Sequence, residues 1–146
     1  MIRLANKYDL DACVEMMRQY SFESGIDALS NTTAHNSEYV SNLLLSLILG
    51  RGFIFIDDQH RGMIAGIITP NIWCNSVMEL RELAWWIHPD FRNKTIGGKL
   101  FLAFNKKADE LIKQNRVKLV YMSLMKNSTV QSLPGYKMID STFLKV

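Results

Sequence analysis

The spacing of apolar and polar positions predicts a chain in which strands and helices are mixed. Short apolar or alternating runs, typical of strands, occur at residues 1–5, 52–57, 63–69, 77–87 and 117–123. Apolar residues three and four positions apart, typical of amphipathic helices, occur at residues 9–18, 37–49 and 96–114. Residues 21–35 are polar without a sustained period, so a loop with at most one short helical turn is expected there.

Turn residues between these runs indicate how the elements connect. The polar turn at residues 58–62 joins two adjacent strands as a hairpin. The strand at 77–87, the helix at 96–114 and the strand at 117–123 form a crossover, which makes the two strands parallel neighbours. The predicted fold is an α/β (α+β) arrangement, a mixed and mostly antiparallel sheet flanked by helices.

Smaller features complete this prediction. Ser37 is a candidate N-cap of the second helix and Gly50 its stop signal. Near the end of the chain, residues 127–133 are expected to form a short helix and residues 134–135 a turn. Residues 136–139 and 142–146 are expected to form a final hairpin.

Length and composition are those of one globular domain. The chain has 146 residues, of which 48% are hydrophobic and 21% charged. No window reaches the roughly 18 to 20 consecutive apolar residues that a membrane crossing needs. Residues 1–7 lack the apolar core of a secretory signal. We therefore expect residues 1–146 to form a single cytoplasmic domain with no membrane partner.

The charge and the cysteines narrow the class of ligand. A net charge of +3 is too small to predict nucleic-acid binding. Cys13 and Cys74 show no metal-ligand spacing, so no metal is expected and both are predicted to be buried free thiols. Basic residues gather around one turn and the helix after it, which suits a small polyanion better than a duplex. They are Arg92, Lys94, Lys99, Lys106 and Lys107.

The most informative segment is residues 85–100, where an apolar strand ends at a proline, passes through a basic turn and enters a helix. Free amides at a helix N-terminus bind phosphate groups, so the segment predicts a phosphate site. It is not a nucleotide P-loop, because Leu100 follows Lys99 where Ser or Thr is required and Asn93 replaces the first glycine. The glycine pattern of dinucleotide-binding folds is also absent.

This segment and the order of elements resemble the GNAT superfamily of N-acetyltransferases, which bind acetyl-coenzyme A. The family pattern is Gln or Arg, two residues, Gly, any residue, and then Gly or Ala. Residues 92–97 read Arg-Asn-Lys-Thr-Ile-Gly and follow it, with Thr95 in place of the first glycine. Residues 87–91, Ile-His-Pro-Asp-Phe, are similar to the family's approach to this turn. Residues 134–136, Pro-Gly-Tyr, fall where the family has Gly-Phe.

The resemblance implies that acetyl-CoA is the cosubstrate, and it implies which residues bind it. The amides of residues 93–98 would bind the pyrophosphate, with added charge from Arg92 and Lys94. The backbone of residues 86–88 would pair with the pantetheine arm. Asn127 would contact that arm or serve as a helix N-cap. The implied binding residues are Trp86, Ile87, His88, Arg92, Asn93, Lys94, Thr95, Ile96, Gly97, Gly98 and Asn127.

Thr95 is the main departure from the family pattern. If this position requires a positive φ, a β-branched residue there costs roughly 1 kcal/mol or more relative to glycine. The Thr95 hydroxyl could instead bind a phosphate or cap the helix. The sequence leaves these alternatives open.

Acetyl transfer to an amine also needs a base, because a primary amine with a pKa of about 10.4 is mostly protonated at neutral pH. Glu79 and Glu82 lie three positions apart on one predicted strand, so they face opposite sides. Glu82 is preferred, because it adjoins an apolar run where burial raises a carboxyl pKa toward neutrality. Either could instead form an ion pair, for example with Arg81, and His88 is a further candidate base.

The leaving thiolate needs a proton, which the family usually takes from a tyrosine on the last helix. That tyrosine is absent here, and Tyr136 and Tyr121 are the substitutes, although such tyrosines are more often packing aromatics of a core or hairpin. The expected activity is direct acetylation of a primary amine on a small molecule or a protein. The resemblance also favours a homodimer, although no exposed stripe argues for one. The alternative is an inactive GNAT-fold binding or structural protein.

Overall fold

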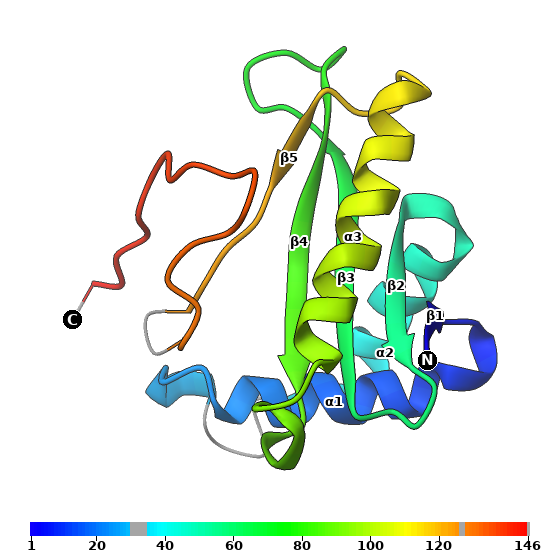
Figure 1. The fold of residues 1–146 in the computed structure, drawn as a ribbon, viewed down its shortest axis with the longest axis vertical. Helices are drawn as coiled ribbons and strands as arrows, with labels where there is room; N and C mark the ends of the chain where they lie inside the picture. Colours follow the sequence, from blue (N-terminus) through cyan, green and yellow to red (C-terminus); the bar gives the residue numbers. More distant parts are fainter. Residues whose placement is uncertain (30–34, 126–127, 146) are drawn as a thin grey trace.

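The computed structural model of the chain describes residues 1–29, 35–125 and 128–145 (Figure 1). Its centre is a five-stranded sheet in the order β1-β2-β3-β4-β5. The first four strands pair antiparallel, and β4 pairs with β5 in parallel. The hairpin predicted around residues 58–62 and the predicted crossover are therefore confirmed. The strands are β1 (Ile2–Leu4), β2 (Gly52–Asp57), β3 (Gly62–Pro70), β4 (Met78–Ile87) and β5 (Leu119–Tyr121).

Helices cover both faces of this sheet (Figure 1). Helices α1 (Leu10–Phe22) and α2 (Ser37–Ser46) bury their apolar sides on one face, together with Trp86 of β4. Helix α3 (Ile96–Lys113) lies on the other face, where Leu100 and Phe104 pack against β2, β3 and β4. No helix in the described parts of the chain is long and apolar enough to cross a membrane.

Short helical turns join these elements. They are η1 (Lys7–Asp9), η2 (Asp27–Leu29), the wide turn η3 (Leu47–Arg51) and η4 (Pro89–Phe91). Helix α2 is capped by Asn36, whose side chain accepts a hydrogen bond from the Tyr39 amide at 2.9 Å. The prediction of Ser37 as N-cap was therefore wrong by one residue. Gly50 does end the helical segment, with a φ of 124° that disfavours any residue with a side chain.

The C-terminal segment departs most from the prediction. Residues 128–133 form no helix, and residues 136–145 form no hairpin. A six-residue segment that ends at a proline is too short to hold a helix by itself, and an isolated two-stranded hairpin is marginally stable without a packing surface. The turn at residues 134–135 is present, since the Tyr136 amide donates to the Leu133 carbonyl at 3.0 Å.

The two cysteines differ in their exposure to solvent. Cys13 is fully buried between α1 and the sheet, as predicted. Cys74 is exposed in the loop between β3 and β4, which corrects the prediction that both thiols are buried. The whole loop lies at the surface, and its apolar residues Ile72 and Trp73 are exposed as well.

Candidate active site

Strands β4 and β5 separate at Arg81. Their pairing covers only Glu79 with Leu119, Leu80 with Val120, and Arg81 with Tyr121. On its other side, β4 stays paired with β3 as far as Ile87. Among the described residues, no strand pairs with the remaining edge of residues 82–87, and the chain after β5 runs away from β4 (Figure 1). This edge leaves backbone groups available to an extended ligand.

A β-bulge lies at the start of this open edge. Ala65 pairs with Ala84 and Gly66 pairs with Glu82, so Leu83 is an extra residue in β4. Bulges bend a strand and increase its local twist. The bend occurs directly after Glu82, where β4 and β5 part.

Glu82 occupies the point of separation without a cationic partner in the described chain. Its Oε2 accepts a hydrogen bond from the Ser123 amide at 3.3 Å, just beyond β5. Burial raises the Glu82 pKa to about 7, and the Ser123 hydrogen bond offsets only part of that effect. A carboxyl group with such a pKa can exchange a proton near neutrality, as the sequence predicted for Glu82.

Glu79 has the opposite surroundings. Its side chain is buried, its Oε1 lies 2.6 Å from Nε of Arg81, and its Oε2 accepts from Nδ2 of Asn71 at 3.0 Å. Burial opposes ionisation of Glu79, but the hydrogen bonds from Asn71 and Arg81 outweigh it and lower the pKa. Of the two glutamates, Glu79 is the one that forms the ion pair with Arg81.

The turn before α3 is exposed and unstrained. Thr95 is the N-cap residue, with φ −83° and ψ −7°, so it lies in the right-handed region and the strain considered from the sequence does not arise. Its side chain makes no capping hydrogen bond, so the capping role is also not observed. Thr95 therefore adopts a backbone conformation that is open to residues with a side chain.

Several amides of this turn have no partner. Among the described residues, nothing accepts a hydrogen bond from the backbone N–H groups of Asn93, Thr95, Ile96, Gly97 and Gly98. A Cβ atom added to Gly98 would meet nothing within 4 Å, so the space beside Gly98 is open. Such a row of free N–H groups at a helix N-terminus fits a pyrophosphate.

Arg92 links this turn to α1. Its Nε donates to the Ile87 carbonyl at 2.9 Å, and its Nη2 pairs with a carboxylate oxygen of Glu23, at the C-terminal end of α1. The other Glu23 oxygen accepts from Trp86 Nε1 at 3.3 Å. Glu23 therefore holds both Arg92 and Trp86. It was not among the predicted site residues, because it lies 69 positions from Arg92 and no local pattern marks the pair.

The other predicted cofactor residues differ in exposure. The Trp86 side chain is buried, and the side chains of Asn93 and Lys94 are exposed. The His88 Nδ1 accepts from the Asp90 amide at 3.2 Å and caps η4. The His88 amide donates to the Arg61 carbonyl at 2.8 Å, so it is already used by the hairpin. Asn127 lies outside the described residues.

Solved structures share this arrangement over nearly the whole chain. A possible acetyltransferase from Clostridium difficile 630 is 14% identical, with a TM-score of 0.63 over 99% of this chain and 98% of its own. A GCN5-related N-acetyltransferase from Ralstonia eutropha JMP134 is 16% identical, with a TM-score of 0.66 over 92% and 97%. The chain has the GNAT fold.

A predicted acetyltransferase from Clostridium acetobutylicum, solved with acetyl-CoA, has the same GNAT fold at 10% identity. Its TM-score is 0.63 over 96% of this chain and 95% of its own. No protein-family model and no curated protein sequence matches the chain. The relationship is therefore visible in the tertiary structure rather than in the sequence as a whole.

The two tyrosines considered as acids have other contacts within this GNAT fold. The Tyr136 hydroxyl donates to Oδ1 of Asn105 on α3 at 2.7 Å, and its ring lies 6.2 Å from that of Phe101. Burial, followed by Asp109, raises the Tyr136 pKa. The Tyr121 ring lies 4.1 Å from the Arg81 guanidinium. No contact in the described chain brings either hydroxyl to Glu82.

Proposed function

We propose that the chain is an acetyl-CoA-dependent N-acetyltransferase that acetylates a primary amine by direct attack. The observation that carries this proposal is the Glu82 carboxyl group, half-buried and without a cation beside the open edge of β4. A residue with a perturbed pKa at such an edge is suited to proton transfer. The acetyltransferases among the structural neighbours support the reaction class.

Binding would use the free groups described above. Acetyl-CoA supplies the acetyl thioester. The amides of Asn93 and of residues 95–98 bind its pyrophosphate, and the side chain of the exposed Lys94 adds charge. The open edge of residues 82–87 offers backbone groups to the pantetheine arm. Arg92 orients the turn through the Ile87 carbonyl and contributes a second cation.

The chemistry requires one bond to form and one to break. The amine nitrogen bonds to the thioester carbonyl carbon, the carbon–sulfur bond breaks, and the thiolate leaves with that electron pair. The nitrogen loses one proton to solvent as the amide forms. An earlier proton, which the protonated amine must lose before it can attack, goes to Glu82 in its carboxylate form. Removing that proton in solution costs about 4 to 5 kcal/mol at neutral pH, which is the deficit that a positioned base relieves. Tyr136 or a water molecule returns a proton to the thiolate.

A second candidate is a GNAT-fold protein that binds ligands without turnover. The absence of a helix at residues 128–133 favours it, because the usual position for the acid is then missing. The Tyr136 hydroxyl is also held by Asn105 rather than directed to Glu82.

Calorimetry with acetyl-CoA tests the binding step. We expect saturable binding, weakened about tenfold in Arg92→Ala, since one charge-assisted contact is lost. Lys106→Ala, which removes an exposed charge from the middle of α3, is the matched control and should bind normally. Both candidates assume that the chain binds acetyl-CoA. If binding does not saturate at millimolar acetyl-CoA, both are rejected.

A thiol-release assay against a panel of primary amines then separates the two candidates. The transferase predicts release that depends on the amine and is lost in Glu82→Gln but retained in Glu79→Gln. Tight acetyl-CoA binding with no amine-dependent release from any member of the panel would support the non-catalytic candidate.

A further inference from the structure

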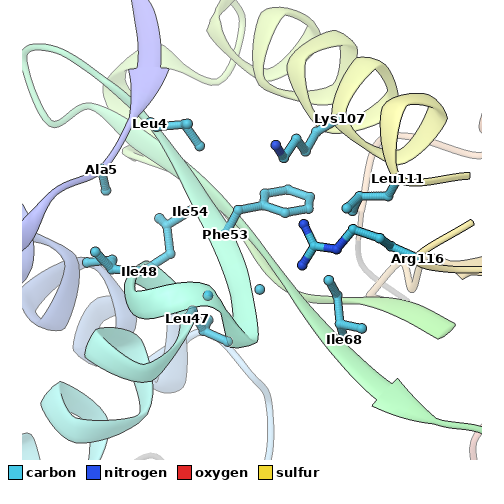
Figure 2. Close-up of a pocket in the computed structure, with 12 residues that line it drawn as sticks. Leu4, Ala5, Leu47, Ile48, Phe53, Ile54, Ile68, Lys107, Leu111 and Arg116 are labelled. Carbon is cyan, nitrogen blue, oxygen red and sulfur yellow. The ribbon is translucent and has the colours of Figure 1, made fainter. Parts of the chain in front are cut away.

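A recess lies beside the second half of α3, whereas the turn at residues 92–98 lies at the start of that helix (Figure 2). It has a volume of about 230 Å³. Its walls come from β1, η3, β2, β3 and the second half of α3. None of its lining residues belongs to the candidate active site, so its existence does not depend on acetyl transfer.

Most of the wall is apolar and already packed. Leu47, Phe53, Ile54 and Leu111 line the recess with side chains that are otherwise buried in the core. These side chains belong to η3, β2 and α3, so the wall is made of regular elements rather than of a loose loop. A rigid apolar wall of this kind is typical of a small-molecule pocket.

Two glycines, Gly50 and Gly52, line the recess. Gly50 has a φ of 124°, which disfavours a side chain there. At Gly52, an added Cβ would lie 2.0 Å from the Gly66 carbonyl oxygen, so the close approach of β2 and β3 excludes a side chain. An added Cβ at Gly50 would meet nothing within 4 Å, so Gly50 leaves open space, whereas Gly52 allows β2 and β3 to approach closely.

Two cationic side chains line the recess. Figure 2 shows the Lys107 ammonium and the Arg116 guanidinium on either side of the Phe53 ring, and all three residues line the recess. No acidic residue is among the described residues that line the recess. Lys107 Nζ lies 3.9 Å from Glu110, at the limit of an ion pair, and Arg116 has no carboxylate partner in the described chain. Two like charges over an apolar wall repel each other, and an anion between them would relieve that repulsion.

Arg116 is held in this place by the end of α3. The Asn115 amide donates to the Ile112 carbonyl at 3.0 Å, and the Arg116 amide donates to the Leu111 carbonyl at 2.9 Å. With Asn115 at φ 57°, these two bonds form the Schellman motif that ends many helices. The backbone that carries the guanidinium is therefore fixed by the helix end.

We propose that this recess binds a small carboxylate with an apolar body. The carboxylate lies between Lys107 and Arg116, and the body lies on Phe53 and its neighbours. A planar guanidinium matches the two oxygens of a carboxylate. The volume suits an aromatic or branched acid, because a cavity of about 150 Å³ accommodates benzene.

Benzoate is the first probe, and benzamide is its neutral isostere. Amide chemical shifts in a two-dimensional ¹H–¹⁵N spectrum report where each binds. We expect saturable shifts at Gly50, Gly52 and Arg116 with benzoate, and binding at least about tenfold weaker with benzamide, because the charge-assisted contacts are lost. Equal affinity for the two compounds, or benzoate shifts confined to residues 92–98, would overturn the proposal.

Matched charge variants locate the anion. Arg116→Gln and Lys107→Gln should each weaken benzoate binding about tenfold. Lys106→Gln, the adjacent exposed position on α3, lies outside the lining and should leave it unchanged. An Arg116→Gln protein with an unchanged spectrum elsewhere and unchanged benzoate affinity would contradict the assignment. These measurements need no acetyl-CoA, so they stand or fall separately from the proposed enzyme activity.

Discussion

Each half of β4 carries one glutamate, and the two glutamates have different hydrogen-bond partners. In residues 78–81 the strand is paired on both edges, and Glu79 is held by Arg81 and Asn71. In residues 82–87 one edge is open in the described chain, and Glu82 has only the Ser123 amide. We refer to these as the closed half (residues 78–81) and the open half (residues 82–87).

This difference shows how one strand can serve both stability and chemistry. In the closed half, hydrogen bonds stabilise the charged form of a buried carboxylate, so its pKa falls. In the open half, burial without a cation destabilises the charged form, so its pKa rises. A group that is costly to ionise and close to a free sheet edge is placed for proton transfer rather than for structure.

The largest effect expected from this comparison is on turnover. Glu82→Gln should lower kcat/KM for acetyl transfer by about 10²- to 10⁴-fold, the range for loss of a general base. Glu79→Gln, the matched change in the closed half, should stay within a few-fold of the wild type. The measurement is thiol release at saturating acetyl-CoA with an accepted amine. An equal loss in the two variants would remove the distinction between the halves.

The two variants should affect stability in opposite directions at pH 8. The raised pKa of Glu82 means that the folded state binds a proton more tightly than the unfolded chain, so stability falls as pH rises from the ordinary carboxyl range through about 7. Glutamine does not ionise, and Glu82→Gln should therefore raise the free energy of unfolding at pH 8, by up to about 3 kcal/mol.

Ionised Glu79 raises the free energy of unfolding, in contrast to ionised Glu82. Its lowered pKa stabilises the fold above the ordinary carboxyl range, and this is lost as pH falls through the lowered pKa. Glu79→Gln should therefore lower the free energy of unfolding at pH 8 by about 1 to 3 kcal/mol. Urea unfolding at pH 5 and pH 8 checks both signs. Loss of stability in Glu82→Gln at pH 8 would show that its carboxylate is stabilised rather than strained by the fold.

The pH dependence of kcat/KM should depend on Glu82, in the open half, and not on Glu79. Ionisation of Glu82 predicts that kcat/KM rises about tenfold per pH unit below a pKa of about 7 and less steeply above it. In Glu82→Gln the inflection near 7 should vanish, whereas in Glu79→Gln it should persist. A profile with the same inflection in all three proteins would assign it to another group.

The smallest effect is expected at Thr95, in the turn that follows the open half. Because Thr95 has a negative φ and no capping hydrogen bond, Thr95→Gly should change the free energy of unfolding by no more than about 0.5 kcal/mol. Acetyl-CoA affinity, measured by calorimetry, should also stay within a few-fold. A stabilisation of 1 kcal/mol or more would mean that the backbone at this turn is strained after all.

Some properties of the candidate site follow from neighbours in the sequence, and others depend on distant segments. The expectation that burial raises the pKa of Glu82 came from the apolar run beside it in the sequence, and it is confirmed. The lowered pKa of Glu79 depends in part on Asn71, which approaches from the loop between β3 and β4. The bulge at Leu83 follows from the register of β4 against β3, which no periodicity in either strand reveals.

The sequence by itself determined the elements from β1 to α3, because apolar spacing follows the helical and extended repeats and depends only on near neighbours. It also determined the place of the turn before α3. Only the tertiary structure decided the contact between Glu23 and Arg92, the unpartnered state of Glu82, the meeting of Lys107 with Arg116 and the irregular tail after β5. Each of these depends on which distant segments pack together or fail to pack, and a local pattern carries no information about that.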